Sequence, residues 1–173
     1  SLTTASDVRE AARRIARELG FDVEDRRKCR TFADAMRLLI DRCEDAGVLV
    51  MVNGIVGCNT HRKLDPTEFR GFALADRLAP LVFVNGADTK SAQAFSLVHE
   101  LAHLWLGQEG VSEASILEES AQEVEKWCNA VAAELLVPLD ALREAIDVSL
   151  PLEGLVKALR AQFKVSSLVI LRR

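Results

Sequence analysis

The stretch LVHELAHL, at residues 97–104, decides how the rest of this sequence is interpreted. It contains the pattern H-E-x-x-H, formed by His99, Glu100 and His103, inside a run with helical periodicity. Two histidines four residues apart lie on one face of a helix, roughly 6 Å apart along its axis. Both imidazoles can therefore bind one metal ion, and neutral imidazole nitrogen suits zinc. The carboxylate between them lies next to the open position of the ion, where Glu100 would activate a zinc-bound water.

An alternative is that two histidines share a helix face without binding a metal. The composition weakens this alternative, because the chain has only 3 histidines and two of them belong to the motif. The residues that flank the motif are mostly apolar, so its helix is expected to be buried. Buried polar and charged groups need a compensating partner, which one Zn²⁺ ion would supply.

A catalytic zinc site usually has three protein ligands and a water molecule, so a third ligand is needed. No histidine follows the motif, so we expect a carboxylate from the next predicted helix, at 116–137. Glu125 and Asn129 lie one turn apart on a face of this helix with small and apolar neighbours, which indicates a packed face. We therefore predict Glu125 as the ligand and Asn129 as a supporting residue beside it. The alternatives are that Glu125 is solvated, or that Glu118 or Glu134 is the ligand.

Helical and strand patterns are segregated along the chain. Helices are expected after Asp7 and after Thr31, both of which are favourable capping residues. A β-rich middle follows, with strands expected at 48–52, 55–56, 69–75 and 81–84. Helices return at 89–106, 116–137, 139–146 and 152–163. This order is typical of an α+β protein. We expect one domain, with a helical part at 1–47, a sheet at 48–86 and a helical part carrying the metal site at 87–173.

The composition argues against several function classes. The net charge is −4, which gives no general attraction to nucleic acid or to anionic membranes. One basic cluster, at 26–30, is predicted to be a solvated loop between two helices. The four cysteines are far apart and form no CxxC pair, which indicates free thiols in a reducing compartment. The sequence shows no signal peptide and no apolar run long enough for a membrane span, so it predicts a cytosolic protein.

Several blocks of the sequence resemble the ImmA/IrrE family of zinc metallopeptidases. They are residues 68–74, 79–85, 92–103 and the run EKWCNAVAAELLVP at 125–138. The last block is similar to the family signature E-x-x-[AC]-N-x-x-A-x-x-[LF]-L-x-P, whose leading glutamate is the third zinc ligand and corresponds to Glu125. The resemblance covers the chain from about Val48 to its end. It implies a zincin-like fold with a small, mostly antiparallel central sheet flanked by helices, in which one helix carries the motif and the next carries the third ligand.

The resemblance also implies a partner. Members of this family are typically bacterial or phage-borne, and several cleave a DNA-binding repressor of the Xre helix-turn-helix type. Many carry such a domain on the same chain, but residues 1–47 contain only two predicted helices, too few for it. We therefore expect a protein substrate on another chain, no direct contact with nucleic acid or membrane, and a cytoplasmic location. Members tend to continue past Arg173, so we also expect a removed C-terminal segment; a monomer is favoured.

The oxyanion donor is harder to choose, because the chain has no tyrosine, a frequent donor in zinc peptidases. The remaining choices are His61, Arg62, Lys63 or a backbone amide. His61 is our hypothesis, because it lies in a polar block between strands, where functional residues often occur. The alternative is an exposed or locally hydrogen-bonded histidine.

The strand predicted at 81–85 comes directly before the motif helix. In zincin-like peptidases an edge strand in this region pairs with an extended substrate through main-chain hydrogen bonds. We therefore predict that Val84, Asn85 and Gly86 lie beside the cleft and contact the substrate. Alternatively, Asn85 only makes the turn.

The sequence thus predicts a zinc-dependent endopeptidase that hydrolyses a peptide bond in a regulatory protein, with an Xre-type repressor as the expected target. One alternative is a zinc-stabilised, non-catalytic module that controls a repressor or antitoxin by binding it. Another is a zinc hydrolase that acts on small molecules. Glu100 discriminates between the first two, because a purely structural H-x-x-x-H site needs no acid between its ligands.

Overall fold

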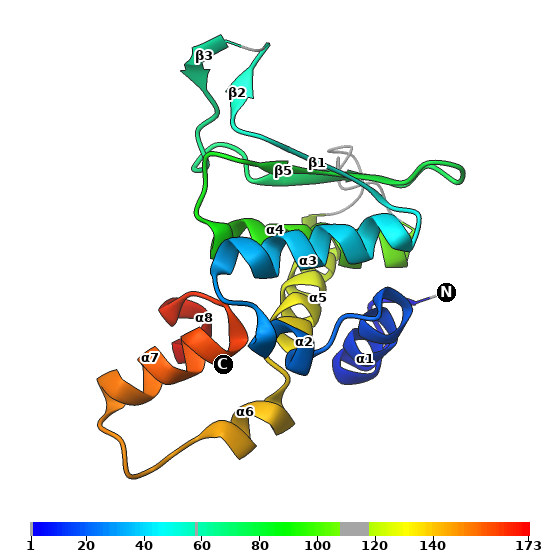
Figure 1. Ribbon diagram of the computed structural model, residues 1–173. Helices are drawn as coiled ribbons and strands as arrows, with labels where there is room; N and C mark the ends of the chain where they lie inside the picture. The colour runs from blue at the N-terminus through cyan, green and yellow to red at the C-terminus, as the bar shows by residue number, and fades with distance from the viewer. Residues whose placement is uncertain (1, 58, 108–117) are drawn as a thin grey trace.

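The computed structural model describes residues 2–57, 59–107 and 118–173, and at 118–120 it describes the backbone only. Figure 1 shows a small sheet lying over a group of helices that comes from both ends of the chain. The predicted α+β class is therefore confirmed. The described helices are Val8–Leu19 (α1), Val23–Lys28 (α2), Phe32–Asp45 (α3), Lys90–Leu106 (α4), Glu118–Leu136 (α5), Leu139–Ala145 (α6), Leu152–Phe163 (α7) and Ser167–Arg172 (α8).

The central sheet has three strands in the order β1–β5–β4, which are Leu49–Asn53, Leu81–Asn85 and Gly71–Leu74. β5 runs parallel to β1 and antiparallel to β4. The short strands β2 and β3, at Ile55–Val56 and Asn59–Lys63, form a separate antiparallel hairpin that extends beyond the sheet (Figure 1). Within the described residues, two of the three strand pairings are thus antiparallel, as the resemblance implied.

β5 is the central strand of the sheet, so the predicted edge position of 81–85 is wrong. β1 pairs with β5 in continuous register from Leu49 opposite Leu81 to Asn53 opposite Asn85, and this ladder occupies the side that was expected to be free. β4 pairs with the other side of β5. The edge strand that packs against the motif helix is therefore β4.

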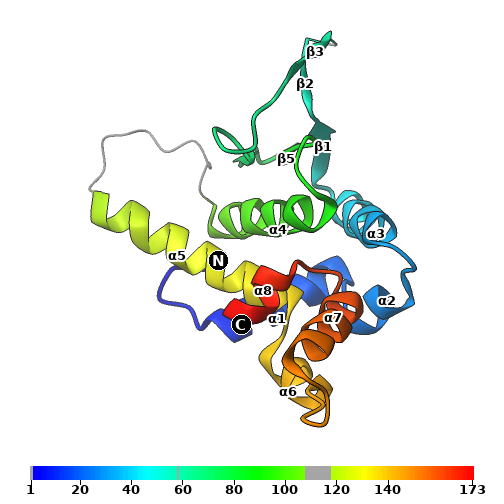
Figure 2. The same cartoon turned by 90° about the vertical axis from the view of Figure 1, so that its left-hand side faces the viewer.

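The two faces of the sheet have different surroundings. Val82, Val84 and Ala73 point to the face that packs on α3 and α4, and their side chains are completely buried. Leu49 and Met51 point to the opposite face and remain about half exposed. Figure 2 shows the helices gathered on the first face only. The sheet therefore covers one side of α4, the helix that carries the H-E-x-x-H motif.

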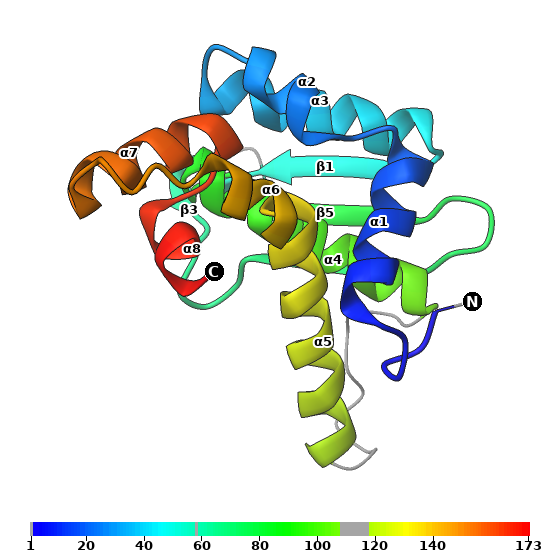
Figure 3. The same cartoon turned by 90° about the horizontal axis from the view of Figure 1, so that it is seen from below.

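α5 holds the helical layer together, because it packs against α4 on one flank and against α1 on another (Figure 3). The Trp127 indole of α5 also donates a hydrogen bond to the Ser6 carbonyl, 3.1 Å away, just before α1. The N-terminal helices are thus part of the same hydrophobic core as the motif helix. Among the described residues, no helix combines the length and the apolar character needed to cross a membrane.

The basic cluster at 26–30 is not a loop, because residues 26–28 belong to α2; Arg27, Lys28 and Arg30 are exposed as predicted, but Arg26 is not. The Arg26 side chain is only 2% exposed, and its guanidinium donates hydrogen bonds to the carbonyls of Leu136, at 2.5 Å, and Phe163, at 3.2 Å. These carbonyls lie at the C-terminal ends of α5 and α7, where the last carbonyls of a helix have no partner within the helix. Arg26 therefore joins α2 to two helices from the other end of the chain.

Candidate metal centre

The motif lies in the middle of a well-defined helix. The Thr89 hydroxyl caps the start of α4 by accepting a hydrogen bond from the Ala92 amide, and Gly107 ends the helix with a left-handed backbone, at φ +68°. Both devices satisfy terminal backbone groups that a helix leaves unpaired. The helix is therefore fixed at both ends, which gives the side chains of the motif between them a defined position.

Three side chains from two helices meet beside the sheet. The Nε2 atoms of His99 and His103 lie 3.2 Å apart. On α5, Glu125 places its Oε2 atom 3.2 Å from His99 Nε2 and its Oε1 atom 3.2 Å from His103 Nε2. Two ligand atoms bound about 2.1 Å from one tetrahedral ion would lie about 3.4 Å from each other. The spacing of these two nitrogens and the carboxylate therefore fits a single zinc ion, and the donor types are those that zinc prefers.

The two imidazoles are held in the form that binds a metal. Burial lowers the pKa of both histidines, and the negative charge of Glu125 opposes this effect only in part. Asn129, one turn after Glu125 on α5, also raises the pKa of His99 through its side chain. The Nδ1 atom of His99 is buried, and no atom of the described residues lies in hydrogen-bonding geometry with it. Both rings are thus neutral near pH 7 and can offer Nε2 to an ion.

Glu100 has the environment of a general base. Its carboxyl group is buried, and this burial, followed by the nearby charge of Glu125, raises its pKa to about 7. A group with a pKa near the working pH can both accept and return a proton. Glu100 points to the start of β4: a methyl group added at Gly71 would lie 3.4 Å from the Glu100 Cγ atom and 2.7 Å from the Phe83 carbonyl oxygen.

Gly71 is a site residue that the sequence analysis missed as such. Its missing side chain allows the edge strand to approach the buried carboxyl group closely. A signal was present in the sequence, since a glycine inside a strand often marks a close approach of the backbone. The signal could be used only once β4 was known to be the edge strand.

The alternative ligands to Glu125 have other positions. Glu134 is buried near the end of α5, where it forms an ion pair with Arg173 and accepts a long hydrogen bond from the Leu139 amide. It therefore stabilises the junction of α5 with the C-terminal helices. The side chain of Glu118 lies outside the described residues.

The structure does not bring His61 to the three converging side chains. It lies on β3, where it is exposed, in the hairpin that extends away from α4 (Figure 1). Its amide donates a hydrogen bond to the Asn59 side chain, 3.0 Å away, so its backbone serves the local turn. The hypothesis that His61 stabilises an oxyanion therefore receives no support from its position.

The structure gives no support to the predicted substrate contacts of Val84, Asn85 and Gly86, because these residues belong to the central strand and its turn. Val84 and Asn85 are completely buried. The Asn85 side-chain amide donates to the Phe69 carbonyl and its oxygen accepts from the Ala87 amide, both at 2.9 Å, which is the turn-making alternative. Gly86 passes so close to Gly54 that a side chain would not fit between them.

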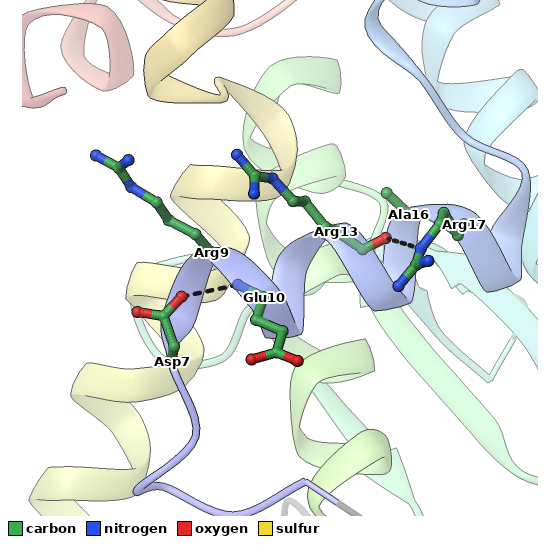
Figure 4. Close-up of a pocket in the computed structure, with 6 residues that line it drawn as sticks. All are labelled: Asp7, Arg9, Glu10, Arg13, Ala16 and Arg17. Atoms are coloured by element: carbon green, nitrogen blue, oxygen red, sulfur yellow. Dashed lines mark hydrogen bonds between the residues drawn. The ribbon is translucent and has the colours of Figure 1, made fainter.

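A surface pocket of about 740 Å³ lies on α1, away from the metal centre, and is shown in Figure 4. Its polar groups already have partners: the Asp7 carboxylate accepts from the Glu10 amide, the Arg17 side chain donates to the Arg13 carbonyl, and the Arg13 guanidinium pairs with Asp140 of α6. None of the residues that line it belongs to the group around His99. This pocket is therefore a feature of the α1 surface and not part of the metal centre.

A small sheet above a helix with H-E-x-x-H, completed by a glutamate from the following helix, is the arrangement of zincin-like metallopeptidases. Residues 43–173 match the family model Peptidase M78, the IrrE N-terminal-like domain. The chain belongs to this peptidase family, so the resemblance to ImmA/IrrE proteins is confirmed. No curated protein matches the chain.

Proposed function

We propose that this protein is a zinc-dependent endopeptidase in which His99, His103 and Glu125 bind one Zn²⁺ ion. One observation carries the proposal: the two histidine Nε2 atoms of α4 lie 3.2 Å apart, and each lies 3.2 Å from a different carboxylate oxygen of Glu125 on α5, directly beside a buried carboxyl group. A structural zinc site is usually closed by a fourth protein ligand, whereas a catalytic site keeps one position open. Three converging side chains with Glu100 next to them match the catalytic type.

The chemistry divides between the ion and the side chains. When bound, zinc supplies Lewis acidity, which lowers the pKa of water and polarises a peptide carbonyl. Glu100 accepts the proton of the attacking water on its carboxylate and later returns it to the leaving amine. Its pKa of about 7 suits both transfers, because neither protonation state is strongly favoured at neutral pH. Burial by the sheet keeps bulk water away from this carboxylate.

We further propose that β4, not β5, binds the substrate chain. β4 has a partner on one side only, so the hydrogen-bonding groups of its other side can pair with an extended peptide. Its first residue, Gly71, lies against Glu100, so a peptide paired with β4 would pass in front of the proposed base.

The proposed target is a regulatory protein of the bacterial cytoplasm, with an Xre-type repressor as the leading possibility. The family supports this proposal, and the helices of the described N-terminal part are packed into the rest of the protein. That part has three helices instead of the two predicted, but α1 and α3 bury their apolar faces against the rest of the protein. Their apolar faces are therefore occupied by packing within the protein.

The test is incubation of the protein with the repressor encoded beside its gene. Zinc-loaded wild type should cut the repressor, and metal removal with EDTA should abolish cleavage until zinc is returned. Glu100→Gln should bind zinc as well as wild type but cut at least about 100-fold more slowly, because it cannot accept a proton. Glu123→Gln, which removes an exposed carboxylate two residues before Glu125, is the matched control and should keep full activity. If Glu100→Gln relieves repression as well as wild type does, the protein acts by binding and the proposal is wrong.

A further inference from the structure

A pocket of about 570 Å³ opens one helical turn away from the proposed zinc ligands. Phe95, one turn before His99 on α4, and Asn129, one turn after Glu125 on α5, form its nearer wall. α8 forms the opposite wall, and Figure 2 shows this helix beside α5 and below α4. A peptide held at the proposed ligands could therefore place one side chain into this pocket.

The lining is apolar inside and positively charged at the rim. Phe95 and Val169 supply partly buried apolar surface, whereas Arg70 and Arg172 are exposed. Within the part of the chain that the structure describes, neither arginine forms an ion pair, and the guanidinium of Arg70 donates only one long hydrogen bond, to the Pro66 carbonyl. Two guanidinium groups are thus free to bind a carboxylate.

The other charged residues of the pocket do not cancel this positive charge. Arg173 is already neutralised by its ion pair with Glu134. Asp88 is the one acidic residue among those lining the pocket, and one of its oxygens accepts a hydrogen bond from the Thr89 amide at 2.7 Å. Two unpaired cations therefore face one carboxylate, and the pocket favours a negatively charged guest.

The edge strand determines which substrate residue reaches the pocket. Arg70 directly precedes Gly71, the first residue of β4, so the pocket lies at the start of this strand. A peptide that pairs antiparallel with β4 runs from the Leu74 end to the Gly71 end. Its C-terminal part, beyond the point where it passes Glu100, therefore comes to the pocket.

We propose that this pocket selects an acidic residue on the C-terminal side of the cleaved bond. The aliphatic part of a glutamate side chain would pack on Phe95 and Val169, and its carboxylate would bind Arg172 and Arg70. This inference rests on the proposed peptidase function and names its substrate class: peptides with glutamate or aspartate immediately after the scissile bond.

Two measurements test the pocket. In the first, zinc-loaded wild type digests a library of peptides from a bacterial proteome, and mass spectrometry identifies the residues after each cut. Acidic residues should be enriched at the first position. In the second, zinc-loaded Glu100→Gln binds fluorescein-labelled, alanine-rich peptides that differ only in carrying glutamate, glutamine or lysine at one position. Glutamate should bind about 10-fold more tightly than glutamine, a typical gain for one charge-assisted contact.

Variants connect the preference to the pocket. Arg172→Gln and Arg70→Gln, made in the Glu100→Gln background, should each reduce the preference for glutamate, and together they should abolish it. Arg143→Gln, which removes an exposed arginine of α6, is the matched control and should keep the preference. Cleavage without acidic enrichment, or a preference that survives the double arginine variant, overturns the inference. A binding preference that depends on Arg172, without any cleavage by wild type, supports the pocket and contradicts the peptidase function.

Discussion

Replacing Glu100 by glutamine should stabilise the metal-free protein at neutral pH. The carboxyl group is 8% exposed, and burial, reinforced by the charge of Glu125, raises its pKa from 4.5 to about 7. In the unfolded chain the same group is in water and titrates near its ordinary value. Without a metal, folding above pH 7 therefore places a carboxylate in an environment that favours the protonated form.

The expected size follows from this shift in pKa. One pKa unit corresponds to about 1.4 kcal/mol, so the change from 4.5 to about 7 corresponds to about 3 kcal/mol. Below pH 4.5 the carboxyl is protonated in both states and costs nothing. Between pH 4.5 and 7 the unfolded chain loses its proton first, so the wild type loses stability as pH rises, and above pH 7 the full cost is present. Glutamine carries no charge in this range, so the variant should gain about 3 kcal/mol over wild type between pH 4.5 and 8.

The assay is urea unfolding followed by circular dichroism, with EDTA present, at several pH values. His99 and His103 have pKa values lowered by burial and also change the stability with pH, but they are present in both proteins and largely cancel in the difference. Glu123→Gln is the control for removing a carboxylate as such and should follow wild type. A difference between Glu100→Gln and wild type that stays constant from pH 4.5 to 8 would refute the burial argument.

Three further predictions concern other parts of the protein. Arg26→Met should lower the free energy of unfolding by about 3 kcal/mol, measured by urea unfolding, because three buried carbonyls lose their donor. Gly71→Ala should reduce the rate of peptide cleavage by about 10-fold or more at unchanged zinc content, because its methyl group displaces the edge strand. Cys43 and Cys128, whose pKa burial raises to about 12, should resist iodoacetamide in the native protein, while the less buried Cys29 is labelled before either of them; peptide mapping checks this order.

Local periodicity predicts the longer helices and the approach of the two histidines, because both depend on residues within one or two turns, but it missed the short α2. Glu125 was predicted from an expected packed face of α5, but its side chain is 51% exposed; the structure nevertheless brings its carboxylate to within 3.2 Å of His99 and His103. The α+β class and the family are confirmed. The assignment of the three side chains as zinc ligands stays a prediction until a metal is measured.

Strand order could not be predicted in the same way. A central strand and an edge strand show the same alternation of residues when one face of the sheet is covered. Only the parallel ladder with β1, a segment far away in the sequence, makes Leu81–Asn85 central. The burial of Arg26 could not be predicted for the same reason: the carbonyls that accept its hydrogen bonds belong to the ends of α5 and α7, far away in the sequence.

The strength of Glu100 as a base depends most on such distant contacts. The motif gives the position of the carboxyl group along α4, but its pKa is set by burial and by Glu125, a residue of another helix. Gly71 is part of this burial, because a methyl group there would collide with the Phe83 carbonyl, 2.7 Å away, and would touch the Glu100 side chain. A larger residue would move β4 outward, admit water to the carboxylate and lower its pKa toward 4.5. The basicity of Glu100 is therefore a property of the spacing between the sheet and α4, and Gly71 is the residue that permits this spacing.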